Sequence, residues 1–168
     1  MAGRHHLFIP GPTALPEQVM RAMDRPTIDH RGPAFQTLAR DVQEGLRWIF
    51  RCEGPVVTYP ASGSGAWEAA LVNTLSPGDR VLMYESGHFA SLWHEIAGRL
   101  GLTAEILPGD WRRGAEAERI EARLREDHAQ DIRAVCVVHN ETSTGCTTDI
   151  PSIRAAIDAA GHPALLMV

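Results

Sequence analysis

Apolar residues recur at helical spacing in several stretches of the chain, most clearly between Pro33 and Phe50. The apolar positions on one face of this predicted long helix are Phe35, Leu38, Ala39, Val42, Leu46, Ile49 and Phe50. Shorter patterns of the same kind predict further helices over residues 16–23, 67–75, 89–100, 117–124 and 150–160. Helices therefore recur along the whole chain.

Short apolar or β-prone runs lie between these helices. They are Val56–Tyr59, Arg80–Tyr84, Thr103–Leu107, Ala134–Val138 and Ala164–Val168. Strands that alternate with helices at this spacing indicate an α/β fold, with a mostly parallel sheet covered by helices on both faces. Because the last residue, Val168, ends a run typical of a buried strand, we expect the chain to be a truncated product or a gene fragment.

Polar loops follow three of the predicted strands. These loops are Ser62–Gly65, Glu85–Phe89 and His139–Gly145. In open α/β sheets, ligands bind beyond the carboxyl ends of the strands. We therefore expect the three loops to converge on one crevice.

The first of these loops, Ser62–Gly65, has the composition of an anion site. It precedes a predicted helix, whose free N–H groups and positive dipole end favour a phosphate, and the hydroxyls of Ser62 and Ser64 can donate to phosphate oxygens. Helix capping by Ser62 or Ser64 explains the same residues equally well. A Walker loop is excluded because the chain contains no lysine. The dinucleotide fingerprint G-x-G-x-x-G matches at Gly63 and Gly65, but its third glycine is Glu68 in this chain. A nicotinamide-binding domain is therefore kept only as the alternative.

Bulk composition narrows the classes of function. The 168 residues carry a net charge of -5, which argues against nucleic acid as the main partner. No apolar stretch has the length of a signal peptide or a membrane span. Three cysteines without C-x-x-C spacing favour a reduced, cytoplasmic setting. His88 and His94 lack partners at metal-ligand spacing, so we expect no metal site.

Five motifs match one known family in order along nearly the whole chain. They are Phe8–Thr13, Thr27–Pro33, Ser62–Glu68, Asn73–Asp79 and His139–Gly145. With these motifs the chain resembles the N-terminal portion of class V, fold-type I pyridoxal-phosphate aminotransferases, in their serine–glyoxylate or alanine–glyoxylate branch. The resemblance implies an N-terminal arm and short helix over residues 1–24. It also implies a partial large domain over residues 25–168, with the C-terminal small domain absent.

The resemblance implies roles for the first two loops. Ser62, Gly63 and Ser64 are similar to the residues that hold the cofactor phosphate. Phe89 occupies the place of an aromatic ring that stacks on the pyridine, where tryptophan is frequent. From the residues alone, the preferred interpretation of Phe89 is the first core residue of an amphipathic helix.

Further roles follow from the same resemblance. Ser143, with Thr142 or Thr144 beside it, is similar to the hydroxyl that bonds the ring oxygen of the cofactor, although the loop also suits a series of Asx and Ser/Thr turns. His30 and Arg31 resemble part of a substrate entrance, where Arg31 attracts a carboxylate. A solvated pair of Asp29 and Arg31 is the alternative.

The implied reaction is transfer of an amino group from serine or alanine to glyoxylate by a ping-pong mechanism, in a homodimer. The Schiff-base lysine of the family, the acid beside the pyridinium nitrogen and the arginine of the small domain are all absent from this chain. We therefore assign no catalytic residue and expect the chain alone to be inactive. A nicotinamide-dependent oxidoreductase domain and a non-catalytic interaction module remain the alternatives.

Overall fold

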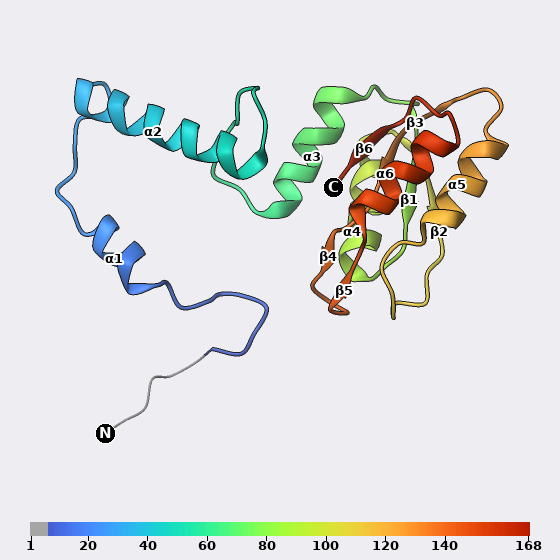
Figure 1. The fold of residues 1–168 in the computed structure, drawn as a ribbon, viewed down its shortest axis with the longest axis horizontal. Coiled ribbons are helices and arrows are strands. Elements are labelled where there is room, and N and C mark those ends of the chain that lie inside the picture. Colours follow the sequence, from blue (N-terminus) through green and yellow to red (C-terminus); the bar gives the residue numbers. More distant parts are fainter. Residues whose placement is uncertain (1–6) are drawn as a thin grey trace. The chain divides into compact units, whose positions relative to one another are not determined.

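The computed structural model describes residues 7–168, and the chain divides into two compact units, the first ending at Pro60 and the second beginning at Ala61 (Figure 1). The first unit contains two helices, and the second contains the sheet with its helices. The domain boundary that the resemblance implies, after residue 24, remains a prediction. No helix in the described part of the chain is long and apolar enough to span a lipid bilayer.

The first unit consists of α1 (Glu17–Met23) and α2 (Pro33–Phe50), joined by a segment without helix or strand that ends in a turn. Pro33 occupies the first turn of α2, where a missing N–H costs nothing, and Arg51 ends the helix in a left-handed conformation. The chain then folds back, and Gln43 donates from Nε2 to the carbonyl of Val56 at 2.9 Å. The strand expected over Val56–Tyr59 is wrong, because this segment pairs with no strand in the described structure.

The second unit is built on a parallel four-stranded sheet in the order β2-β1-β3-β6. Its strands are β1 (Arg80–Tyr84), β2 (Thr103–Leu107), β3 (Ile132–Cys136) and β6 (Leu165–Met167). Its helices are α3 (Gly63–Thr74), α4 (His88–Arg99), α5 (Ala117–Glu126) and α6 (Ile150–Ala159). The predicted α/β fold with a parallel sheet is confirmed. The strand predicted over Ala134–Val138 begins two residues earlier than expected, at Ile132.

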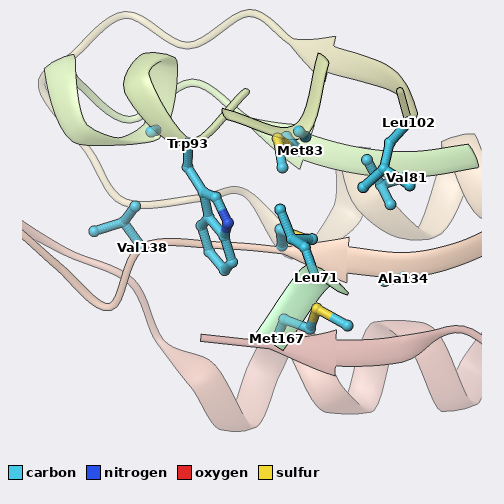
Figure 2. Packing of buried hydrophobic residues seen from close by; sticks show 11 residues of the cluster. Leu71, Val81, Met83, Trp93, Leu102, Ala134, Val138 and Met167 are labelled. Carbon is cyan, nitrogen blue, oxygen red and sulfur yellow. The ribbon is translucent and has the colours of Figure 1, made fainter. Parts of the chain in front are cut away.

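Successive residues of the two central strands pack into two different cores. Val81 and Met83 of β1 pack with α3 and α4, whereas Leu82 and Tyr84 pack with α5 and α6. Figure 2 shows the first of these cores, in which the indole of Trp93 extends from α4 between Val138 and Leu71. Because both faces of the strands are covered, the strands appear in the sequence as nearly continuous apolar runs.

α3 reaches the carboxyl edge of the sheet although no strand precedes it among residues 7–62. A tight turn at Ser76–Asp79 connects its end to the start of β1, so helix and strand run in opposite directions. Twelve helical residues span about 18 Å, and the five residues of β1 span about 16 Å. The first turn of α3 therefore returns to the level at which β1 ends.

The polar loop after β3 folds as a small hairpin that the sequence did not predict. Its strands are β4 (Asn140–Glu141) and β5 (Cys146–Thr147), which pair antiparallel. Gly145 has a φ of 75°, and its N–H donates to the carbonyl of Glu141 at 2.8 Å. A glycine suits this left-handed position, which allows the hairpin to close in four residues.

Candidate functional site at the carboxyl edge of the sheet

Two of the three predicted loops are bonded directly to each other. The backbone N–H groups at the start of α4 donate to side chains of the β4–β5 hairpin, and the hydroxyl of Thr144 donates to the carbonyl of Ser86. The third loop, Ser62–Gly65, opens α3, which contacts α4 through aromatic side chains. All three loops thus belong to one edge of the sheet.

The start of α3 leaves backbone donors open. Ser62 is the N-cap residue by position, yet its hydroxyl makes no capping hydrogen bond. The N–H groups of Gly63 and Ser64 have no acceptor among the residues that the structure describes. Gly63 is exposed and Ser64 is half-buried. Unpaired N–H groups at the positive end of a twelve-residue helix form a suitable place for an anion.

The start of α4 is instead closed by the hairpin. Glu141 is 1% exposed, and its carboxylate accepts hydrogen bonds from the N–H groups of Phe89 at 3.3 Å and Ala90 at 3.1 Å. The N–H of His88 donates to Ser143 Oγ at 2.9 Å. Burial raises the pKa of Glu141, but hydrogen bonds from the hydroxyl and N–H of Ser143 and from the two helix N–H groups bring it below the usual value. Glu141 is therefore held as a carboxylate.

Phe89 lies in the first turn of α4 and is half-buried, so it is not a residue of the inner core. Its ring meets the indole of Trp67 at a centroid distance of 6.4 Å and the imidazole of His88 at 5.6 Å, both near edge-to-face. Trp67 in turn stacks on Trp93 at 4.8 Å. The aromatic contact between α3 and α4 places the open N–H groups and the Phe89 ring on neighbouring elements.

Thr142 and Ser143, both exposed, differ in what their hydroxyls do. The Ser143 hydroxyl donates to Glu141 at 2.7 Å and accepts from the His88 N–H, so its single hydrogen is used. The Thr142 hydroxyl has no hydrogen-bond partner among the described residues. Of the two, Thr142 is the one with a free donor.

His30 and Arg31 lie in the other unit, in the turn before α2, and both are exposed. The carboxylate of Asp29 accepts from the backbone N–H of Arg31 at 2.9 Å and forms no ion pair with its guanidinium in the described structure. His94 contacts the carbonyl of Ala104 through Nε2 at 3.1 Å. Within residues 7–168, no group of three His, Cys, Asp or Glu side chains is arranged to hold a metal ion.

Sequence reasoning missed Glu141 and Gly87. A Cβ on Gly87 would lie 2.5 Å from Glu141 Cγ, so only glycine leaves room for this side chain. One signal was available: α4 begins at a glycine, without a local Ser, Thr, Asp or Asn at its N-cap. A helix without a local cap requires acceptors from elsewhere, and the loop after β3 supplies them.

Comparison with known proteins places this geometry in a family. The aminotransferase class-V family model matches residues 5–168. The chain is 50% identical to a serine–glyoxylate aminotransferase of Methylorubrum extorquens, over 99% of this chain and 42% of that protein. It is 43% identical to an L-aspartate–glyoxylate aminotransferase of Paracoccus denitrificans, over 100% of this chain and 43% of that protein.

The fold also matches solved structures. An aspartate aminotransferase of Thermus thermophilus superposes with a TM-score of 0.83 at 31% identity, over 94% of this chain and 43% of that one. The chain thus spans about two fifths of the length of the relatives that it matches. Because the family model matches nearly every residue, the chain belongs to the aminotransferase class-V family.

Proposed function

We propose that this chain is the cofactor-binding part of a longer aminotransferase that moves an amino group from serine or alanine to glyoxylate by a ping-pong mechanism. The observation that carries the proposal is one sheet edge with an open helix start, a half-buried aromatic ring and a free hydroxyl, in a class-V chain. The family implies pyridoxal phosphate as the cofactor.

The residues present fit the phosphate of that cofactor. Gly63 and Ser64 offer two backbone N–H groups without acceptors, and the hydroxyls of Ser62 and Ser64 stand beside them. Hydrogen bonds to a charged group are worth about 1.5–3 kcal/mol each. Since the dipole of α3 adds to them, this helix start is the part of the chain that binds the phosphate.

The remaining contacts orient the ring. Phe89 would offer an aromatic surface for stacking, and the free hydroxyl of Thr142 would donate to the ring oxygen of the cofactor. Ser143 instead completes the contact between the hairpin and α4, because its hydrogen is donated to Glu141. His30 and Arg31 serve at the substrate entrance, where an exposed guanidinium attracts the carboxylate of an incoming substrate.

When bound, pyridoxal phosphate supplies the electron sink for bond changes at the amino-acid α-carbon. This chain contributes binding and orientation. It has no lysine, so no described residue fills the role of the family's lysine in moving the substrate proton. We therefore expect the 168-residue chain alone not to transaminate, whereas the longer protein does.

The oxidoreductase alternative receives less support from the same geometry. In a dinucleotide-binding domain the glycine loop follows a strand of the sheet, whereas Ser62–Gly65 follows a segment that joins no strand. Glu68 is exposed on α3 at the position of the third glycine. We retain small amino acids and 2-oxo acids as the substrates, and a homodimer and a cytoplasmic setting as proposals based on the resemblance and on the odd number of cysteines.

Binding of pyridoxamine 5′-phosphate tests the proposal, because this form of the cofactor needs no lysine. We expect it, and inorganic phosphate, to shift the amide NMR signals of Gly63 and Ser64. Ser64→Ala should weaken binding about tenfold. The matched control is Ser152→Ala in the first turn of α6, which should leave binding unchanged. Equal weakening by both variants, or shifts confined to other amides, would contradict the phosphate site.

Activity of the longer protein tests the reaction. Glycine formed from glyoxylate should be measured with serine, alanine and aspartate as donors. Serine or alanine is expected to give the highest kcat/KM. Aspartate as the best donor would favour the specificity named for the Paracoccus relative.

A further inference from the structure

The first turn of α4 takes its acceptors from a segment about 50 residues away. Its first three N–H groups, those of His88, Phe89 and Ala90, all donate to Glu141 or Ser143. The separation between donor and acceptor is 51 to 55 residues. The position of Phe89 therefore depends on the hairpin after β3 as well as on its own helix.

The contact is closely packed and carries a charge. Glu141 Oε1 also accepts from the N–H of Ser143 at 3.1 Å and from its hydroxyl at 2.7 Å. The side chain passes Gly87 at a distance that no Cβ would allow, and it is 1% exposed. In this arrangement the carboxylate accepts from four donors at once.

The starts of α3 and α4 differ in whether their N–H groups have a protein acceptor. The N–H groups at the start of α4 are occupied by an internal anion, whereas those of Gly63 and Ser64 on α3 have no protein acceptor in the described chain. An external anion is thereby directed to α3. The ring of Phe89 on α4 lies beside α3, in edge contact with Trp67.

We propose that Glu141 is a positioning residue of the cofactor site, which fixes the ring of Phe89 by occupying the start of α4 as an internal anion. The inference rests on the proposed function for the identity of the ligand. It assigns Glu141 a role in how the ring of the cofactor is held, and none in holding its phosphate.

Glu141→Gln is the sharpest perturbation, because it keeps the shape of the side chain and removes its charge. One amide oxygen can replace Oε1 and keep the bonds from Phe89 and Ser143. The amide NH2 then faces the N–H of Ala90, which loses its acceptor. We expect hydrogen exchange at Ala90 to accelerate at least tenfold and the NMR signals of the Phe89 ring to shift.

The matched control is Asp127→Asn at the opposite end of β3. Asp127 is also a buried carboxylate, and its Oδ2 accepts from the N–H of Ile132 at 2.8 Å and contacts His162 Nε2 at 3.2 Å. It lies before β3, whereas Glu141 follows it. Loss of general stability affects both variants, but loss of ring positioning affects only Glu141→Gln.

Ligand binding to the full 168-residue chain distinguishes loss of ring positioning from loss of general stability. Glu141→Gln should weaken pyridoxamine 5′-phosphate about tenfold and leave inorganic phosphate unchanged at the amides of Gly63 and Ser64. Asp127→Asn should change the binding of neither compound when the variants are compared at an equal folded fraction. A Phe89 ring signal that is unchanged in Glu141→Gln, or equal effects of both variants, would overturn the proposal.

The ligand-free signals keep this test independent of the proposed function. If the unmodified chain binds neither phosphate compound, the proposed function fails, while the Phe89 and Ala90 signals still decide the role of Glu141. If Glu141→Gln does not fold, Ser143→Ala removes the hydroxyl that bonds Glu141 and His88 and should produce the same ring shift. An unchanged ring in that variant would likewise overturn the proposal.

Discussion

Alanine at two glycines of α4 should change stability in opposite directions. Gly87 is the N-cap residue of this helix, and Gly98 lies in its last turn. A Cβ at Gly87 would meet Glu141 Cγ at 2.5 Å and Ser143 Oγ at 2.6 Å, whereas a Cβ at Gly98 has nothing within 4 Å. The same chemical change is therefore made at a filled position and at an open one.

The magnitudes follow from these contacts. Carbon atoms pack best at about 3.5–4.0 Å, so Gly87→Ala must displace the Glu141 side chain by roughly 1 Å. Overpacking of this kind costs about 1–3 kcal/mol, and losing one hydrogen bond to the carboxylate adds about 1.5–3 kcal/mol. We expect Gly87→Ala to lower the free energy of unfolding by about 2.5–6 kcal/mol. Gly98→Ala should raise it by about 0.5–1 kcal/mol, because it removes only backbone entropy of the unfolded chain.

Urea unfolding monitored by tryptophan fluorescence measures both variants, since Trp67 and Trp93 lie in the core that α4 covers. A wild-type midpoint should fall between those of the two variants, and the m-value should stay constant. If Gly87→Ala is as stable as the wild type, or if both variants lose stability equally, the close approach of Glu141 to the start of α4 is refuted.

Three further predictions concern other parts of the unit. Asp127 has a pKa below its usual value, because hydrogen bonds from Ile132 and His162 outweigh the effect of burial, which alone raises it. Its stabilising contribution should be complete above about pH 4 and be lost as the pH falls further, and Asp127→Asn should remove this part of the pH dependence of unfolding. Leu71→Ala, at 1% exposure, should cost about 2–5 kcal/mol in urea unfolding, whereas Val72→Ala, at 51%, should change it by less than about 0.5 kcal/mol. Burial raises the pKa of Cys136 to about 12, so a thiol reagent at pH 8 should label the exposed Cys52 quickly and Cys136 only on unfolding; rapid native labelling of Cys136 would refute its burial.

Apolar spacing in the sequence was sufficient to predict the helices and the four strands of the parallel sheet. The central strands were recognisable because both of their faces are buried. Ala134, Val135 and Cys136 pack alternately into the two cores and therefore form an uninterrupted apolar run. Val56–Tyr59 has the same β-prone composition but no neighbouring strand, and composition alone does not show whether a partner exists. The β4–β5 hairpin escaped prediction because each of its strands has two residues, most of them polar.

The candidate site was predictable where it depends on local sequence. Gly63 and Ser64 stand at the start of a helix, and a glycine-serine loop before a helix is a recognisable anion motif. The closure of α4 by Glu141 depends on residues 51 positions apart, and only the topology of the sheet brings them together. The distinct uses of the Thr142 and Ser143 hydroxyls depend on that same contact.

The strand order has a consequence for synthesis on the ribosome. β1 occupies an inner place in the sheet, with Arg80 opposite Thr103 on one side and Ile132 on the other. Its second partner lies 52 positions downstream, which at about 5–20 residues per second emerges roughly 3–10 s later. During that interval one edge of β1 is unpaired, and its Leu82 and Tyr84 side chains await the helices that cover them. In a nascent chain, β1 is thus a segment that a chaperone shielding apolar strands would protect until β3 emerges.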